Sequence, residues 1–218
     1  MKMGKKKYPV FIGLLFFYIV IFYWIYQIKR DQIPWLDEWS RQYVDSFPGT
    51  TFYDFFWTIT HLGSKSFLLP FTIFVGVILW VLCKDWLIAL FFSGGTLLSH
   101  LLNKGLKLMI ERERPGILEG VNAEGFSFPS GHAMTGMVCY GLLMYFLIRK
   151  VSNKKVSLLL QVLFALLILS IGTSRYVIDV HYATDIVSGF TIGFTLLLIL
   201  LYTFEKISEK RTKTINQS

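Results

Sequence analysis

The chain has 218 residues, of which 54% are apolar and 17% are charged, and its mean hydropathy is +0.53. Soluble domains contain about 45–50% apolar and about 25% charged residues, so this composition excludes a disordered, collagen-like or ordinary soluble protein. The net charge of +8 would suggest nucleic-acid binding in a soluble protein; in a membrane protein it marks the cytoplasmic face, so no nucleic-acid partner is expected.

A membrane span requires about 20 apolar residues, so six spans would use most of the apolar residues and leave only loops and tails. We therefore predict an all-α, polytopic membrane protein with six transmembrane helices, forming one integral-membrane domain over residues 1–218. Cys83 and Cys139 both lie in apolar runs, and we interpret them as core side chains that form neither a disulfide nor a metal pair.

The first apolar run, Tyr8–Ile28, follows a segment with four lysines, residues 1–7. A signal peptide also begins with basic residues, but its apolar core has about 7–15 residues and small residues follow it. Here the run has 21 residues and is followed by Lys29 and Arg30, so we interpret it as a retained span. The other predicted spans are residues 66–83, 86–102, 132–148, 156–172 and 183–204.

Lys and Arg are densest in residues 1–7, in residues 149–155 and in the tail after residue 204. Because cytoplasmic segments are enriched in basic residues, both termini are predicted to be cytoplasmic. This orientation places the two long polar loops, residues 29–65 and 103–131, outside the cytoplasm.

The first of these loops has a helical pattern of its own. Its apolar residues recur at helical spacing: Trp35, Leu36, Trp39, Tyr43, Val44 and Phe47. The other side of the same helix carries Asp37, Glu38, Arg41 and Asp45. The pattern predicts an amphipathic helix in the membrane interface, with a second one over residues 52–62. These helices either cap the bundle without a function of their own or form a gate for lipid entry.

Three polar clusters lie near span ends, where charges are costly and need a reason. In the first, Lys107 and Arg114 are seven residues apart, about two helical turns, which would place both on one face. Pro115 disfavours helix at Arg114, so we expect the helix to end there. Arg can bind two phosphate oxygens and Lys acts as a point charge, so the pair predicts an anion site. Snorkelling or solvation in the loop is the alternative interpretation.

The second cluster precedes the fourth predicted span and includes Pro129, Ser130, Gly131 and His132. Ser130 is a candidate N-cap, and Gly131 would let a ligand approach the backbone. Free N–H groups at a helix start bind phosphate, helped by the helix dipole. His132 would lie in the first turn beside such an anion, although a histidine at a span end can also be structural.

The third cluster contains Ser174, Arg175, His181 and Asp185. His181 and Asp185 are four residues apart, so on a helix they would face each other. A carboxylate bound to one ring nitrogen fixes the tautomer and leaves the other nitrogen free to attack. Arg175 adds a third cation. The alternative is a buried His–Asp pair that only stabilises a helix start.

Together the clusters place three cations, two histidines, a paired carboxylate and a glycine turn on one predicted side of the membrane. Phosphoryl transfer depends mainly on electrostatic stabilisation of dispersed negative charge, which such groups can provide without a metal. The sequence has no HExxH motif, Cys-rich zinc pattern, Mg²⁺-type carboxylate cluster or Walker-type glycine loop. Neither a metal nor a nucleotide cofactor is therefore predicted.

The order K-x6-RP, PSGH and SR-x5-H-x3-D resembles the type 2 phosphatidic acid phosphatase family, which shares its site with vanadium haloperoxidases. The motifs span residues 107–185, and the six-span layout extends the resemblance over most of the chain. The chain looks most like small bacterial membrane members of the phosphatidylglycerophosphatase B and undecaprenyl-diphosphate phosphatase types. All motif positions match: Lys107, Arg114, Pro115, Pro129, Ser130, Gly131, His132, Ser174, Arg175, His181 and Asp185.

The resemblance implies a role for each of these residues. His181 would be the nucleophile that forms a phosphohistidine, Asp185 would orient it, and His132 would be the general acid. The residues alone identify which histidine is paired with a carboxylate and leave the reverse assignment of the two histidines open. The resemblance also implies the phosphate-binding groups: Lys107, Arg114, Arg175, Ser130 and the Gly131 backbone.

The expected function is a metal-independent lipid phosphatase at the outer surface of a bacterial plasma membrane. Candidate substrates are undecaprenyl diphosphate, phosphatidylglycerol phosphate and phosphatidic acid; the oligomeric state is left open. A protein that binds or transports lipid phosphates without turnover is the alternative, although binding alone needs no pair such as His181 and Asp185. A vanadate-dependent haloperoxidase would share the anion pocket, but the family's peroxidases are not small six-span proteins.

Overall fold

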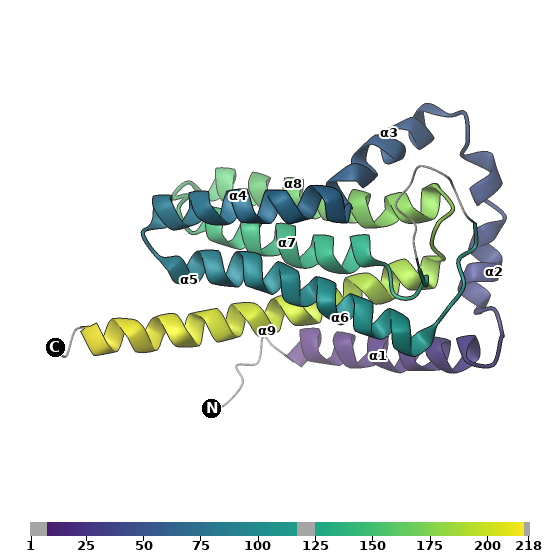
Figure 1. Ribbon diagram of the computed structural model, residues 1–218, viewed down its shortest axis with the longest axis horizontal. Coiled ribbons are helices and arrows are strands. Elements are labelled where there is room, and N and C mark those ends of the chain that lie inside the picture. The colour runs from purple at the N-terminus through teal and green to yellow at the C-terminus, as the bar shows by residue number, and fades with distance from the viewer. Residues whose placement is uncertain (1–7, 117–124, 216–218) are drawn as a thin grey trace.

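The computed structural model describes residues 8–116 and 125–215, which form helices and contain no strand (Figure 1). Residues 1–7, whose lysines contribute to the predicted orientation, lie outside the described residues. Six helices are long and apolar enough to cross a membrane, which confirms the six-span prediction. They are Tyr8–Ile28, Lys65–Cys83, Trp86–Ile110, Gly131–Ile148, Lys154–Val177 and Ala183–Thr214.

The helices follow the predicted order. They are α1 (Tyr8–Ile28), α2 (Trp35–Arg41), α3 (Thr51–Ile59), α4 (Lys65–Cys83), α5 (Trp86–Ala89), α6 (Gly95–Ile110), α7 (Gly131–Ile148), α8 (Lys154–Val177) and α9 (Ala183–Ile215). Two short 3₁₀ segments, η2 (Val44–Ser46) and η3 (Thr60–Gly63), follow α2 and α3. A π-helical turn, η4 (Leu90–Gly94), joins α5 to α6, so that together they form one span.

Helix α7 is the centre of the bundle, and α6, α8 and α9 pack around it. Met134, Val138 and Leu142 on α7 have no exposed surface. In contrast, Ile21 is the one buried residue of α1, and Trp24, Ile25 and Ile28 pack beside it against the bundle. Most other apolar side chains of α1 are exposed, as expected of a helix that faces lipid. Both cysteines are free. Cys139 of α7 belongs to the core as predicted, whereas Cys83, at the end of α4, is only partly buried.

The start of α7 is in close contact with the second and third turns of α9, because α9 carries glycines there. A Cβ at Gly189 would lie 2.7 Å from the carbonyl oxygen of Ser130, and one at Gly193 would lie 2.6 Å from that of Met134. Small residues let helix backbones approach closely within membranes. This packing brings Asp185, in the first turn of α9, next to the start of α7.

The polar clusters all lie at one end of the bundle (Figure 1). The ends of α6 and α8 and the starts of α7 and α9 meet there, and α2 lies across them. The α4–α5 and α7–α8 turns and the last turns of α9 are at the other end.

The loop between α1 and α4 forms helices as predicted, but the first is shorter and differently oriented. It ends at Arg41 and is followed by η2, so it does not continue to Phe47. Asp37, which was predicted to be on the polar side, is only 1% exposed, whereas Trp35 is 70% exposed. The reason is a buried cation, Arg112, which pairs with Asp37. The aromatic face of α2 is therefore turned outward, and its position in the membrane interface remains a prediction.

Candidate active site

Lys107 and Arg114 lie close together as predicted, but they are not on one helix, which was the predicted reason. Helix α6 ends at Ile110, four residues before Arg114, because Glu111 adopts a left-handed conformation and its N–H caps the carbonyl of Lys107. Residues 112–116, which follow Glu111, have no regular secondary structure. The Lys107 ammonium and the Arg114 guanidinium both donate to the carbonyl oxygen of Phe126, the latter over 3.4 Å.

The start of α7 has the predicted N-cap. The Ser130 hydroxyl accepts a hydrogen bond of 3.4 Å from the Ala133 N–H, and its backbone N–H donates to the Asp185 carbonyl over 3.1 Å. The helix begins at Gly131, where a Cβ would lie 3.0 Å from Oδ1 of Asn103. Asn103 in turn donates to the Pro129 carbonyl over 3.0 Å and so holds the turn against α6.

His132 occupies the first turn of α7 and is 9% exposed. Its Nε2 is buried and has no hydrogen-bond partner within the described parts of the chain. Lys107, Arg175 and His181 are near enough to interact with its ring electrostatically. A buried nitrogen without a partner is costly, so this position is suited to a polar ligand.

His181 and Asp185 are paired as predicted, but by a different local geometry. His181 lies in the loop before α9, while Asp185 lies in the first turn of that helix. His181 Nδ1 and Asp185 Oδ2 are 3.2 Å apart, and the Tyr182 N–H donates to the same oxygen over 2.9 Å. The Ser127 hydroxyl contacts His181 Nδ1 at 3.2 Å and also bonds Asp185 Oδ2. The carboxylate thus fixes one ring nitrogen of His181 and leaves Nε2 on the other side.

The other ring nitrogen of His181 faces Arg114. Nη1 of Arg114 is 3.2 Å from Nε2 of His181 and donates to the Val180 carbonyl over 2.8 Å. Burial is the main factor that holds the pKa of His181 well below 6.5, and the surrounding cations Lys107, Arg114, Arg175 and Arg112 lower it further. The imidazole is therefore neutral at pH 7, and Nε2 keeps the lone pair that a nucleophile needs.

Arg175, in the last turn of α8, is 2% exposed. Its Nη1 donates to the Thr60 hydroxyl over 3.2 Å, and its Nε has no partner within the described residues. Ser174, the motif residue beside it, donates to the Ile171 carbonyl over 2.6 Å and so supports the helix backbone. The structure thus gathers Lys107, Arg114 and Arg175 around the two histidines, which is a suitable arrangement for an anion.

Four residues at the site were not predicted. Arg112 bridges Asp37 and Asp185, Thr184 bonds to Asp37, and Ser127 bonds to His181 and Asp185. Arg112 and Ser127 lie inside the motif region, but no pattern in the sequence indicates a partner for either. Asp37 lies far outside that region, and its only sequence signal was a charge among the aromatic residues of α2.

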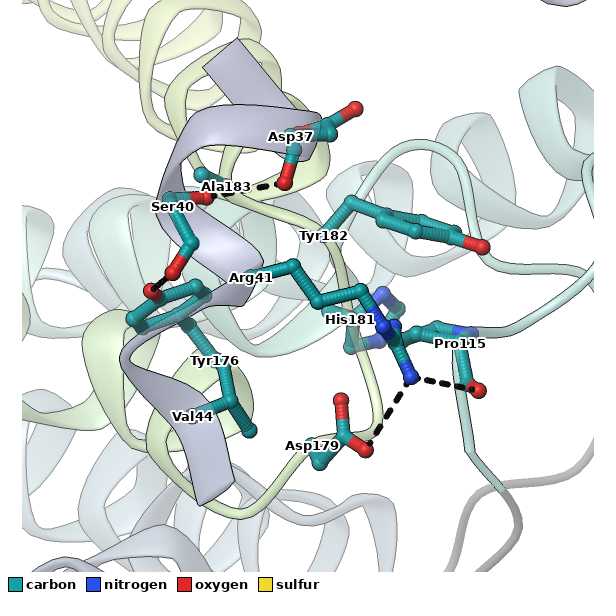
Figure 2. A pocket seen from close by; sticks show the side chains of 10 residues that line it. All are labelled: Asp37, Ser40, Arg41, Val44, Pro115, Tyr176, Asp179, His181, Tyr182 and Ala183. Atoms are coloured by element: carbon teal, nitrogen blue, oxygen red, sulfur yellow. Dashed lines mark hydrogen bonds and ion pairs between the residues drawn. The ribbon is translucent and has the colours of Figure 1, made fainter. Parts of the chain in front are cut away.

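A small pocket opens beside His181, with about 190 Å³ of space that is partly open to solvent. Figure 2 shows Arg41 extending from α2 across this pocket towards Asp179 and Pro115. Its guanidinium lies 3.5 Å from the Asp179 carboxylate and donates to the Pro115 carbonyl over 3.2 Å. Within the described residues, no group of three or more His, Cys, Asp or Glu side chains is arranged to hold a metal.

Residues 86–209, more than half of the chain, match the PAP2 superfamily. The chain is 38% identical to phosphatidylglycerophosphatase B of Bacillus subtilis (strain 168) over 162 residues, covering 71% of this chain and 76% of the relative. The crystal structure of a transmembrane PAP2-type phosphatidylglycerolphosphate phosphatase from Bacillus subtilis superposes with a TM-score of 0.77 at 30% identity, covering 90% of this chain and 96% of that one.

The fold is also similar to that of Aquifex aeolicus LpxE, with a TM-score of 0.56 at 26% identity over 73% of this chain and 90% of that chain. The family match includes all three motifs, and the fold similarity extends to the helices around them. The chain therefore belongs to the PAP2 superfamily, the type 2 phosphatidic acid phosphatase family that its motifs resemble.

Proposed function

We propose that this protein hydrolyses the phosphomonoester or diphosphate of membrane lipids through a phosphohistidine on His181, without a metal. The observation that carries the proposal is the position of His181: Nδ1 is 3.2 Å from the Asp185 carboxylate, and Nε2 is 3.2 Å from the Arg114 guanidinium. An anion bound by Arg114 would lie next to the lone pair of Nε2. A protein that only binds phosphate has no need for this oriented nitrogen.

In the first step, His181 Nε2 forms a bond to phosphorus and the bond between phosphorus and the lipid oxygen breaks. Asp185 accepts a hydrogen bond from Nδ1 and stabilises the positive charge that develops on the ring. His132 donates a proton to the leaving oxygen, which produces the lipid alcohol or, from a diphosphate, the lipid monophosphate.

In the second step, water attacks phosphorus and the bond to His181 breaks, which releases inorganic phosphate. His132 accepts a proton from the water, so both histidines return to their starting states. Lys107, Arg114 and Arg175 neutralise the equatorial oxygens in both steps, helped by Ser130 and the Gly131 backbone at the start of α7.

We propose the plasma membrane of a bacterium as the location, with both termini in the cytoplasm and the site on the outer face. Support comes from Arg149 and Lys150, which lie in the α7–α8 turn at the end of the bundle opposite the site. The substrate candidates are undecaprenyl diphosphate, phosphatidylglycerol phosphate and phosphatidic acid. The names of the Bacillus subtilis relatives favour phosphatidylglycerol phosphate.

The test is phosphate release from each of these three lipids in detergent micelles by purified protein in EDTA. Wild type is expected to be active, and His181→Ala is expected to lose at least ~10³-fold in kcat because the covalent route is closed. His100→Ala is the matched control, since His100 lies on α6 outside the site and should leave kcat unchanged.

A second measurement distinguishes an enzyme from a binding protein. Wild type quenched during turnover with labelled substrate should carry an acid-labile phosphoryl group on His181, whereas His181→Ala should carry none. Lipid binding without turnover or phosphohistidine would favour the binding protein instead. Full activity in His181→Ala would overturn the mechanism, and activity that requires an added divalent cation would overturn metal independence.

A further inference from the structure

A buried arginine links the site to the helix that covers it. Arg112 is 8% exposed and lies in the irregular segment after α6. Its Nη1 donates to Asp185 Oδ1 over 2.7 Å and its Nη2 donates to Asp37 Oδ2 over 2.7 Å. The guanidinium also lies 3.7 Å from the centre of the Tyr182 ring, which packs against its face.

Arg112 occupies the one oxygen of Asp185 that the histidine does not use. Oδ2 of Asp185 receives His181, Ser127 and the Tyr182 N–H, whereas Oδ1 receives Arg112. Without Arg112, the carboxylate would have a buried oxygen with no charged partner, and it could rotate away from the plane of the His181 ring. A carboxylate directs a catalytic histidine only while its orientation is fixed.

Arg112 is itself held by α2. Asp37 Oδ1 accepts from the Thr184 N–H over 2.9 Å, and its Oδ2 accepts from the Thr184 hydroxyl over 2.7 Å as well as from Arg112. Asp37 therefore binds both the arginine and the first turn of α9. Asp37 is 1% exposed and Thr184 is fully buried, so water does not compete for these bonds.

We propose that Arg112 and Asp37 are positioning residues for the reaction: Arg112 orients the Asp185 carboxylate, Asp37 orients Arg112, and the docking of α2 thereby aligns His181. The inference rests on the proposed function. It makes α2 part of the catalytic apparatus, since the same helix supplies Arg41 at the pocket and a carbonyl, that of Ser40, to the Tyr176 hydroxyl over 2.6 Å.

The position of Arg112 distinguishes it from the phosphate-binding cations. Both of its terminal nitrogens are bonded to protein oxygens, so it has no direct part in holding the substrate. Its loss should therefore lower kcat and leave substrate affinity unchanged. A purely structural role would instead lower thermal stability and reduce kcat and affinity together.

The experiment measures kcat, KM, the inhibition constant of inorganic phosphate and the melting temperature in detergent. Arg112→Gln is expected to lower kcat by at least about tenfold, with KM and phosphate inhibition within about twofold of wild type. Arg149→Gln is the matched control, because it removes an Arg–carboxylate pair, with Glu205, at the other end of the bundle and should leave kcat unchanged.

Asp37→Asn tests the link to α2. It should lower kcat in the same way, and the double variant Arg112→Gln/Asp37→Asn should be no slower than Arg112→Gln alone, because both residues act through Asp185. Arg112→Lys keeps the buried positive charge, and it replaces Arg112→Gln in the kcat measurement if the glutamine variant does not fold. Its single ammonium cannot reproduce the two-sided contact, so kcat should again fall.

Wild-type kcat in a folded Arg112→Lys or Arg112→Gln protein would overturn the inference, as would multiplicative losses in the double variant. A parallel fall in kcat, phosphate affinity and melting temperature would also overturn it and would assign Arg112 a structural role. His181→Ala distinguishes failure of the proposed function from failure of this inference. If His181→Ala stays fully active, the proposed function fails. If His181→Ala is inactive while the Arg112 variants have wild-type kcat, only the positioning role of Arg112 fails.

Discussion

Gly63→Ala is expected to slow the reaction by displacing His132, although residue 63 carries no chemistry. Gly63 ends η3, and its α-carbon faces the His132 ring and Ile171. A Cβ there would lie 2.6 Å from Cδ2 of His132 and 2.4 Å from Cγ2 of Ile171. Carbon atoms pack best at about 3.5–4.0 Å, so both neighbours must move away from residue 63 by about 1 Å.

The surroundings leave little room for that movement. Ile171 is fully buried and His132 is 9% exposed, so the displacement must pass into a packed core. We expect the substitution to lower the free energy of unfolding by about 1–3 kcal/mol through overpacking. A misplacement of about 1 Å at a catalytic group can reduce the rate by about 10²-fold, and we expect a loss of that order in kcat.

The assay is lipid phosphate release in detergent micelles, together with thermal unfolding of the same preparation. Gly105→Ala is the control, because no atom lies within 4 Å of its added Cβ and alanine is favoured in a helix. If Gly63 acts through His132, Gly63→Ala should have no further effect in a His132→Ala background. A Gly63→Ala protein with wild-type kcat would refute the assignment of His132 to a fixed catalytic position.

Two further predictions concern pH and packing. Because the pKa of His181 lies well below 6.5, the decrease in kcat/KM that protonation of Nε2 causes at acidic pH should be centred below pH 6.5. The need for a protonated His132 limits kcat/KM on the alkaline side of the profile instead. An acidic decrease limited by His181 and centred at or above pH 6.5 would contradict the buried, cation-surrounded site. Leu142→Ala in α7 should lower the free energy of unfolding by about 2–5 kcal/mol, since Leu142 is fully buried. Leu158→Ala, at a position that is 62% exposed on α8, should change the free energy of unfolding far less, and equal losses measured by denaturant titration in detergent would contradict the bundle core.

Hydropathy alone predicted the six spans, because a helix must satisfy its own backbone hydrogen bonds in lipid and needs a fixed apolar length to cross it. Motif spacing predicted which residues gather at the site: His181 with Asp185, and Lys107 with Arg114. Hydropathy and motif spacing are both read from neighbouring residues in the chain. Their predictions held even where the predicted local secondary structure was wrong. The predicted helix from Lys107 to Arg114 ends at Ile110, and His181 lies outside α9. Lys107 and Arg114 nevertheless donate to the same carbonyl oxygen, that of Phe126.

Only the tertiary structure decided what holds these groups in place. Asp37 and Arg112 are 75 residues apart, and the outward face that hydropathy predicted for Asp37 is the buried one. Their pairing depends on how α2 packs over the starts of α7 and α9. Amphipathic periodicity separates polar from apolar residues, but a buried charge whose partner is distant in the chain violates it, and only the folded arrangement shows that partner.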